Sequence, residues 1–158
     1  MATLTATFAA VRGDDLALAD DTGTLTWAEL DERVNRLING LRDAGIGSGD
    51  TIAVVAGNCN EWFEVAMACA NAGITFVPVN WHLVAPEIAY ILDDSQTAVL
   101  FVGPETAQRG LDAARLAGVT TVVGWGRDLP DGVTPWADWL ARSSDEDPPE
   151  DVRPRPNL

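Results

Sequence analysis

Two short stretches of this sequence are apolar and rich in β-branched residues, with no polar position alternating through them. They read TIAVVA at residues 51–56 and TAVLFV at residues 97–102. A strand with one solvent-exposed face alternates apolar and polar side chains, whereas a continuous run of apolar residues indicates a strand buried on both faces. Such strands are typical of parallel sheets covered by helices, so these stretches constrain the fold more than any other feature.

Segments with helical periodicity separate the expected strands. After TWAE at residues 26–29, which fits a capping box, apolar residues recur at helical spacing: Leu30, Val34, Leu37, Ile38 and Leu41. A second helix, over 60–71, is apolar nearly all round and is expected to be buried. The other expected elements are a hairpin over 16–27, strands over 74–79 and 119–123, and helices over 86–92, 104–117 and 135–141. This order predicts an α/β fold with a mostly parallel sheet and helices on both faces.

The sequence GIGSG at residues 45–49 raises the question of a phosphate-binding loop. A Rossmann or P-loop cradle lies between a strand and the N-terminus of the following helix, where free N–H groups and the helix dipole face the phosphate. GIGSG instead follows an expected helix and precedes the strand at 51–56. This order predicts that Gly45 ends the helix with a positive φ and that the next residues form a turn.

Charge and composition exclude several classes of function. The chain has 24 acidic and 10 basic residues, a net charge of −14, and every basic residue is arginine. Without a basic cluster it is a poor candidate for binding nucleic acid or an anionic membrane surface. The absence of lysine excludes a Walker-type phosphate lysine, a Schiff base and a catalytic ammonium within this sequence.

Other sequence features favour a cytoplasmic protein. No stretch reaches the roughly 20 apolar residues of a membrane span, and residues 1–15 lack the basic region of a signal peptide. Cys59 and Cys69 form neither a CxxC pair nor a metal-ligand pattern, so we expect buried free thiols.

Sites in parallel sheets form at the carboxyl ends of strands, and two of these ends carry unusual residues. After 51–56 the expected helix N-terminus could receive an anion, but capping by Asn58 or Asn60 is favoured. After 74–79 come Asn80, Trp81 and His82, which include the single histidine of the chain. No nucleophile or carboxylate stands at a recognisable spacing from it, so we expect a structural role or a pocket or interface wall. No catalytic, cofactor-binding or metal-binding residue is predicted.

Acidic residues outside these strand ends are expected on solvated faces. Glu61 and Glu64 are one helical turn apart, and Asp93 and Asp94 end a helix, but neither pair forms a metal motif. After Arg142 the sequence becomes polar, acidic and proline-rich. The predicted organisation is therefore an α/β subdomain over 1–142 and a linker or tail over 143–158, whose acidic run at 145–151 is either solvated or bound to a partner.

The order of these pieces over Leu25–Val102 resembles the N-terminal part of the AMP-forming acyl-CoA synthetases, in the adenylate-forming ligase superfamily. The similarity rests on LTWAEL at 25–30, GIGSGDTIA at 45–53, GITFVPVN at 73–80 and EIAYIL at 87–92. At His82 many relatives have an arginine instead, which leaves the role of this position open. The matching residues belong to the scaffold, so the resemblance assigns a catalytic role to none of them.

The resemblance implies a two-step reaction. A carboxylate attacks the α-phosphate of Mg-ATP to give an acyl-adenylate and pyrophosphate, and the thiol of coenzyme A then accepts the acyl group. The family uses a T-S-G-T-T-G-x-P-K loop, later adenine and ribose motifs and a C-terminal lysine, none of which this sequence contains. The phosphate loop is expected soon after residue 158.

The sequence is therefore interpreted as an N-terminal fragment of an acyl-CoA ligase, inactive alone. Its expected partner is the remainder of the ligase, in the same parent chain or a second polypeptide, and ATP, Mg and CoA are expected only in the complete ligase. Fatty acid metabolism is the expected setting. Asn80, Trp81 and His82 are expected to face the missing part. The alternatives are a non-catalytic binding or regulatory module and one half of a two-chain ligase.

Overall fold

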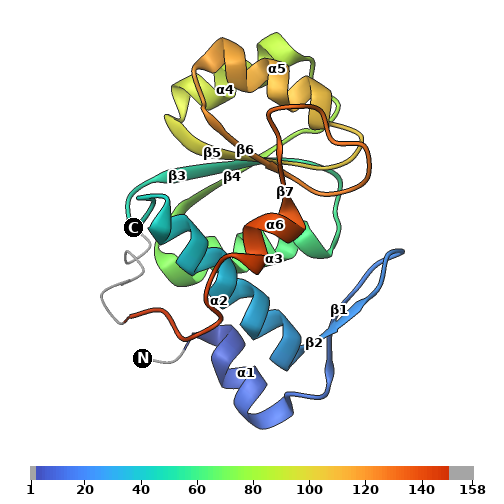
Figure 1. Cartoon of the computed structure of the whole chain (residues 1–158), viewed down its shortest axis with the longest axis vertical. Coiled ribbons are helices and arrows are strands. Elements are labelled where there is room, and N and C mark those ends of the chain that lie inside the picture. Colours follow the sequence, from blue (N-terminus) through green and yellow to red (C-terminus); the bar gives the residue numbers. More distant parts are fainter. Residues whose placement is uncertain (1–2, 150–158) are drawn as a thin grey trace. The chain divides into compact units, whose positions relative to one another are not determined.

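The computed structural model describes residues 3–149, in which helices alternate with single strands or with pairs of strands along the chain (Figure 1). These residues form two compact units. Unit 1 contains residues 3–48, 58–74 and 140–149, and unit 2 contains residues 49–57 and 75–139. The predicted boundary between a subdomain over 1–142 and a tail over 143–158 stays a prediction, and residues 150–158 of that tail lie outside the described residues.

Unit 2 is built on a five-stranded sheet with the strand order β4-β3-β5-β6-β7, in which every neighbouring pair is parallel. The predicted class, α/β with a mostly parallel sheet, is confirmed. The strands are β3 (Thr51–Val55), β4 (Thr75–Val79), β5 (Thr97–Val102), β6 (Thr121–Gly124) and β7 (Thr134–Pro135). Helix α4 (Ala85–Asp94) follows β4, and helix α5 (Ala107–Ala117) follows β5.

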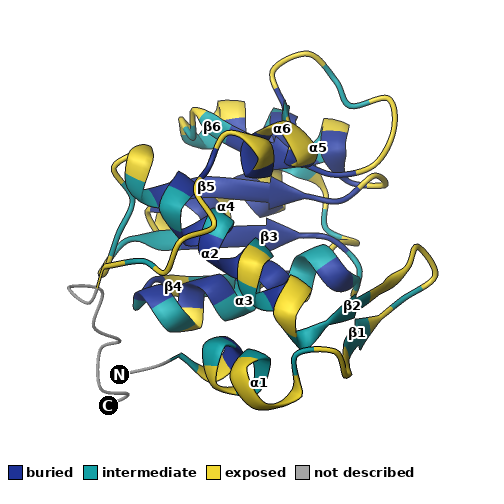
Figure 2. Cartoon of the chain, turned by 60° about the horizontal axis from the view of Figure 1, so that its bottom comes forward, coloured by how far each residue is buried: buried dark blue, intermediate teal, exposed yellow. Residues whose placement is uncertain are grey.

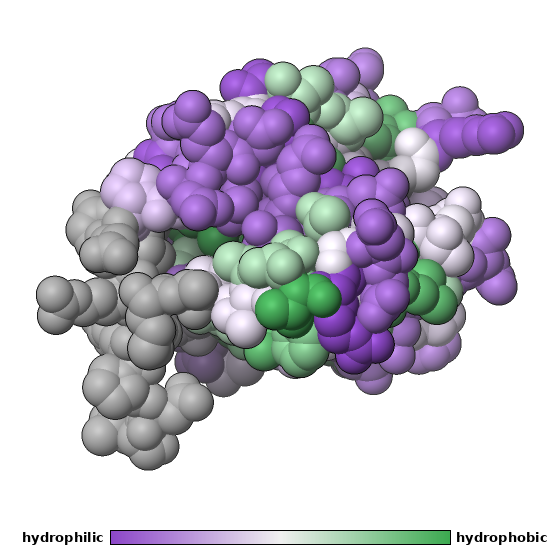
Figure 3. All heavy atoms as spheres, turned by 90° about the horizontal axis from the view of Figure 1, so that it is seen from below, coloured by the Kyte–Doolittle hydropathy of each residue, from purple (hydrophilic) through white to green (hydrophobic). Residues whose placement is uncertain are grey.

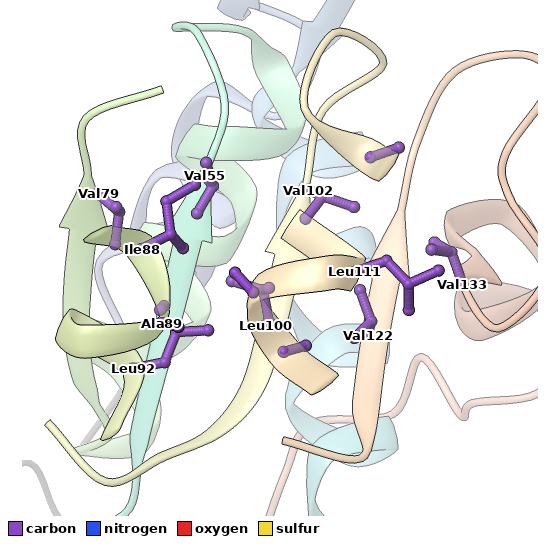
Figure 4. Close-up of a cluster of buried hydrophobic side chains, with 14 residues drawn as sticks. Val55, Val79, Ile88, Ala89, Leu92, Leu100, Val102, Leu111, Val122 and Val133 are labelled. Atoms are coloured by element: carbon purple, nitrogen blue, oxygen red, sulfur yellow. The ribbon is translucent and has the colours of Figure 1, made fainter. Parts of the chain in front are cut away.

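Both faces of the central strands are buried, as the continuous apolar runs predict. Residues 52–55 and 99–102 are each at most 1% exposed, and β3 and β5 are dark blue in Figure 2. On one face Leu100 and Val102 pack with Ile88 of α4 and Leu111 of α5 (Figure 4). On the other face the rings of Phe101 and Trp136 pack nearly perpendicular, with 6.0 Å between their centroids, and Trp136 opens α6 (Trp136–Ala141). Helical residues therefore cover both faces of the sheet within unit 2.

Unit 1 contains a hairpin and three helices that pack in sequence order, α1 on α2 and α2 on α3. They are α1 (Leu4–Arg12), β1 (Leu16–Ala19), β2 (Thr24–Thr26), α2 (Trp27–Asp43) and α3 (Asn60–Ala72). The predicted capping box opens α2: the Glu29 N–H donates to Thr26 Oγ1 at 3.3 Å, and the Thr26 N–H donates to Glu29 Oε2 at 2.8 Å. Gly45 has a φ of 81°, so the sequence GIGSG ends a helix and precedes a strand, as predicted.

Several expectations for the helices were wrong. Helix α1 and strand β7 were not predicted from the sequence. Helix α3 was expected to be buried all round, but Phe63 on this helix is 40% exposed. Glu64 was expected on a solvated face but is 0% exposed. The reason is the packing of α3 against α2, which brings Glu64 onto the Nε of Arg33 at 2.7 Å. Asp93 and Asp94 are exposed, as predicted.

One face of the molecule is seen in Figure 3, coloured by hydropathy. The face seen in Figure 3 is mostly hydrophilic, and hydrophobic residues gather there in separate small patches. Within residues 3–149, no helix combines the length and the apolar character that crossing a membrane requires.

Candidate functional site

The parallel sheet of unit 2 places four loops at one edge, because the carboxyl ends of parallel strands meet there. These loops follow β3, β4, β5 and β6. The chain runs from β3 to β4 on one side and then to β5 on the other side of β3. The strand order therefore reverses between β3 and β5, which is where open α/β sheets usually bind ligands.

The predicted residues Asn80, Trp81 and His82 form the loop directly after β4. Asn80 Oδ1 accepts a hydrogen bond from the His82 N–H at 3.0 Å, which folds the loop into an Asx turn. The indole and imidazole rings lie against each other, with centroids 3.9 Å apart and planes inclined by 32°. All three residues are exposed, and Trp81 is 38% exposed. The loop thus presents two adjoining rings to solvent, and their role as a pocket or interface wall stays a prediction.

Arg109 on α5 supports this loop, and sequence reasoning missed it. Its Nη2 donates to the carbonyl oxygen of Trp81 at 2.7 Å. Its Nε is buried and has no hydrogen-bond partner among residues 3–149. The residues are 28 positions apart, and no local pattern links them. Only the neighbouring positions of α5 and the β4 loop in the fold reveal the contact.

The loop after β5 closes over the end of β3 at the reversal point. Gly103 N–H donates to the Val55 carbonyl at 3.2 Å, and the buried Thr106 hydroxyl hydrogen-bonds to the same carbonyl. A Cβ at Gly103 would lie 3.0 Å from the Cβ of Ala56, closer than most real Cβ contacts. Glycine is therefore favoured at this close approach, because any larger residue would require Ala56 to shift.

The backbone N–H of Gly57, in the loop after β3, is paired with a carboxylate of the chain. The Gly57 N–H donates to Glu105 Oε1 at 3.2 Å. A carboxylate repels phosphate, so the Gly57 N–H, as it is paired here, does not offer a site for a phosphate of Mg-ATP. Within residues 3–149, no group of three or more His, Cys, Asp or Glu side chains could hold a metal ion. The sequence could have revealed Glu105, because it follows β5 as closely as His82 follows β4.

The N-terminus of α3, in unit 1, also receives a carboxylate of the chain, although not from the predicted caps. Its N-cap residue is Cys59, which makes no side-chain capping bond. Instead the Asn60 N–H donates to Asp20 Oδ2 at 2.8 Å, and Asn60 Nδ2 donates to the Gly23 carbonyl at 3.1 Å. Capping by Asn58 or Asn60 was therefore wrong, because the turn of the hairpin supplies the cap from 40 residues away.

The hydrogen bonds at this cap also explain the acidity of Asp20. The hydroxyl of Thr22 donates to Asp20 Oδ1 at 2.7 Å and is the main cause that lowers the pKa of Asp20, assisted by the N–H of Asn60. Asp20 is thus held as the anion that a helix N-terminus favours.

The two cysteines are free thiols, as predicted. Burial raises the pKa of Cys59 and of Cys69 to about 12, so both stay protonated at neutral pH. Cys69 is buried as expected, whereas Cys59 is only partly buried because it lies at the start of α3. Neither thiol is a candidate nucleophile.

Comparison with known proteins places the chain in a family. The model of the AMP-binding enzyme family matches residues 5–157. The chain is 36% identical over 132 residues to the fatty acid–[acyl-carrier-protein] ligase ScoC of Streptomyces coeruleorubidus, covering 83% of this chain and 24% of that ligase. It is 46% identical over 94 residues to the feruloyl-CoA synthase of an Amycolatopsis species, covering 58% of this chain and 19% of the synthase.

A solved structure shows the corresponding region. The N-terminal domain of FACL13 from Mycobacterium tuberculosis superposes with a TM-score of 0.73 and 27% identity, over 92% of this chain and 36% of that domain. The chain thus spans about a quarter or less of the length of the two relatives and about a third of this domain. With the parallel sheet and motif order described above, these matches show that the chain belongs to the AMP-binding enzyme family and corresponds to an N-terminal portion of its acyl-CoA ligases.

Proposed function

We propose that this chain is the N-terminal part of an AMP-forming acyl-CoA ligase, in which it supplies α/β scaffold and no catalytic group. The complete ligase would join a carboxylate to AMP and then transfer the acyl group to the thiol of coenzyme A. The observation that carries this proposal is the match to ScoC, which covers 83% of this chain but 24% of the ligase.

Two features support inactivity of the chain alone. The sequence contains no lysine, and the Gly57 N–H at the sheet edge is paired with Glu105 instead of being open to an anion. ATP, Mg and CoA are therefore assigned to the complete ligase.

The names of the relatives support an organic acid as the substrate. One acts on a fatty acid with a carrier protein, and the other is named for feruloyl-CoA. We assign coenzyme A as the acceptor and place the reaction in fatty acid metabolism in the cytoplasm. An acyl-carrier protein in place of CoA is the control acceptor in the assay below.

Asn80, Trp81 and His82 are proposed to face the remainder of the ligase. Their loop is exposed and folded in advance by the Asx turn and by Arg109. Next to it, α4 carries a shallow, mostly apolar hollow of about 420 Å³, lined by Leu83, Pro86, Glu87, Tyr90 and Ile91. Tyr90 is 71% exposed, which supports burial of this face by further protein.

Native mass spectrometry of the protein purified from its own cells, followed by denaturation of the same sample, tests this proposal. We expect the sequence within a longer ligase, or a released companion chain whose mass completes one. That material should catalyse acid-dependent exchange of pyrophosphate into ATP, and acyl transfer to CoA in preference to carrier protein. A lone monomer or homodimer without exchange activity would overturn the proposal and favour a non-catalytic binding module.

A further inference from the structure

Residues 143–147, here called the strap, lie along helix α2 within unit 1 and are held by its side chains. Asn39 Nδ2 donates to the carbonyl oxygens of Ser144 at 2.8 Å and Glu146 at 2.9 Å. Arg36 Nη1 donates to the carbonyl oxygen of Ser143 at 2.7 Å. The acidic side chains at 145–147 are exposed, but the main chain of the strap is hydrogen-bonded to the helix. Residues 150 and 151 of the predicted acidic run lie outside the described residues.

A third residue of α2 completes the surface. Asn35 is 4% exposed, and its Nδ2 donates to the Asp145 carbonyl at 3.4 Å and to Asp147 Oδ1 at 3.3 Å. Asn35, Arg36 and Asn39 lie on one side of the helix, because positions three and four apart are neighbours on its surface. A buried amide without acceptors is costly, so docking of the strap also satisfies Asn35.

Most hydrogen bonds between α2 and the strap go to main-chain atoms of the strap. The carbonyl oxygens of four successive residues, 143–146, each accept a hydrogen bond from α2. Side-chain recognition is confined to Asp147, on Asn35, and to Asp145, whose Oδ2 accepts from Arg36 Nη2 at 2.9 Å. Arg36 also pairs with Glu32, so its positive charge is shared between α2 and the strap.

We propose that the Asn35, Arg36 and Asn39 face of α2 is a docking surface for the main chain of an extended acidic segment, and that the strap is its occupant. The surface fixes the path by which the polypeptide leaves α6 across unit 1. Because the amide donors bind carbonyl oxygens, the acidic side chains of the strap contribute less to docking than Asn39 does. This role is independent of any ligase activity.

Order parameters from ¹⁵N relaxation of the full 158-residue chain test the proposal. In the wild type we expect residues 144–147 near 0.85, the value of rigid backbone, and in Asn39→Asp below about 0.6, the range of flexible segments. Asp at this position keeps the shape of Asn, loses both donors and faces the carbonyls with a charge. Asn39→Ala removes the donors without adding the charge and should give the same result.

Two control variants separate main-chain from side-chain recognition. Asp43→Asn changes a charge at the exposed end of α2 and should leave the strap ordered. Asp145→Ala removes the strap carboxylate that accepts from Arg36 but keeps the main-chain carbonyl, and should also leave the strap ordered. Amide shifts of α3 in the same spectra report whether each variant is folded. The proposal is overturned if the strap is already flexible in the wild type, if Asp145→Ala frees it, or if both folded Asn39 variants leave it rigid.

Discussion

Units 1 and 2 differ in the chemistry of their interiors. Unit 2 packs aliphatic side chains of a parallel sheet against two helices, with Leu100 and Val102 at 0% exposure. Unit 1 places an acid between its helices: Glu64 is equally buried and meets Arg33, which is 31 positions away in the sequence. An apolar core tolerates many substitutions of similar volume, whereas a buried charge depends on one partner. Unit 1 should therefore be the unit more sensitive to the loss of one polar side chain.

Replacing Arg33 by methionine should produce the largest effect. Methionine keeps an apolar stem but leaves Glu64 buried without its partner. Already in the wild type, Oε1 of Glu64 has no hydrogen bond within the described residues. Breaking one side of a buried ion pair typically costs about 3–5 kcal/mol. Urea unfolding of Arg33→Met at neutral pH should show a loss of this size, and adding Glu64→Gln should recover part of it.

The same pair determines how stability responds to pH. Burial raises the pKa of Glu64, and Arg33 opposes that rise. A carboxyl group with a raised pKa binds its proton more readily in the folded state, so its contribution to stability falls as pH rises through that pKa. The loss in Arg33→Met should thus be smaller under mildly acidic conditions, where Glu64 becomes protonated. A loss that is equal at acidic and neutral pH would show that Glu64 does not cause it.

In unit 2 the matching experiment removes volume instead of charge. Leu100 is fully buried at the centre of the sheet, and truncating such a leucine to alanine costs about 2–5 kcal/mol through lost burial and a cavity. No titratable group pairs with this side chain, so the loss in Leu100→Ala should not change between acidic and neutral pH. Leu116→Ala on α5 is the control: that side chain is 67% exposed, and the change should be within about 0.5 kcal/mol. A pH-dependent loss in Leu100→Ala would contradict the contrast between the units.

Sequence patterns predicted unit 2 better than the polar contacts of unit 1. The runs at 51–56 and 97–102 identify buried parallel strands, because only a sheet covered on both faces accepts them. Glu64 instead has the pattern of a surface residue, because nothing in its sequence spacing indicates that Arg33 of α2 faces it. The cap from Asp20 and the docked strap are missed for the same reason: each joins polar groups that are distant in sequence.

The candidate site was predictable to the same limited extent. The rule that sites lie at the carboxyl ends of strands locates Asn80, Trp81 and His82 correctly in the loop after β4. The same rule could have identified Glu105 after β5, but it gives no indication that Glu105 accepts a hydrogen bond from the Gly57 N–H or that Arg109 holds the loop after β4. Both contacts depend on how α5 and the loop before it lie over the sheet edge, which local periodicity does not encode.

Loss of the remote helix cap should have a smaller effect, confined to unit 1. Asp20→Ala removes the acceptor of the Asn60 N–H, and loss of an N-cap acceptor typically costs about 1 kcal/mol. Because hydrogen bonds lower the pKa of Asp20, its contribution is present above the ordinary carboxyl pKa and is lost as pH falls through the lowered value. Hydrogen exchange should accelerate in the first turn of α3. Asp21→Ala, in the same exposed turn, is the control and should leave that turn unchanged.

The smallest effect on stability is expected at Arg109, where the change is local to the predicted site. Arg109→Met removes the donor to the Trp81 carbonyl, and an exposed hydrogen bond of this kind contributes about 0.5 kcal/mol, the low end of the usual range. The Asx turn of Asn80 remains, so the loop should stay folded but become more mobile, with lower order parameters at residues 80–83. Arg115→Met on the same helix removes only an exposed pair with Asp112 and should leave those values unchanged. If the loop is equally rigid in both variants, the Asx turn alone organises it. Arg109 would then have no positioning role, and the loop would depend only on local contacts, unlike the strap and the cap of α3 in unit 1.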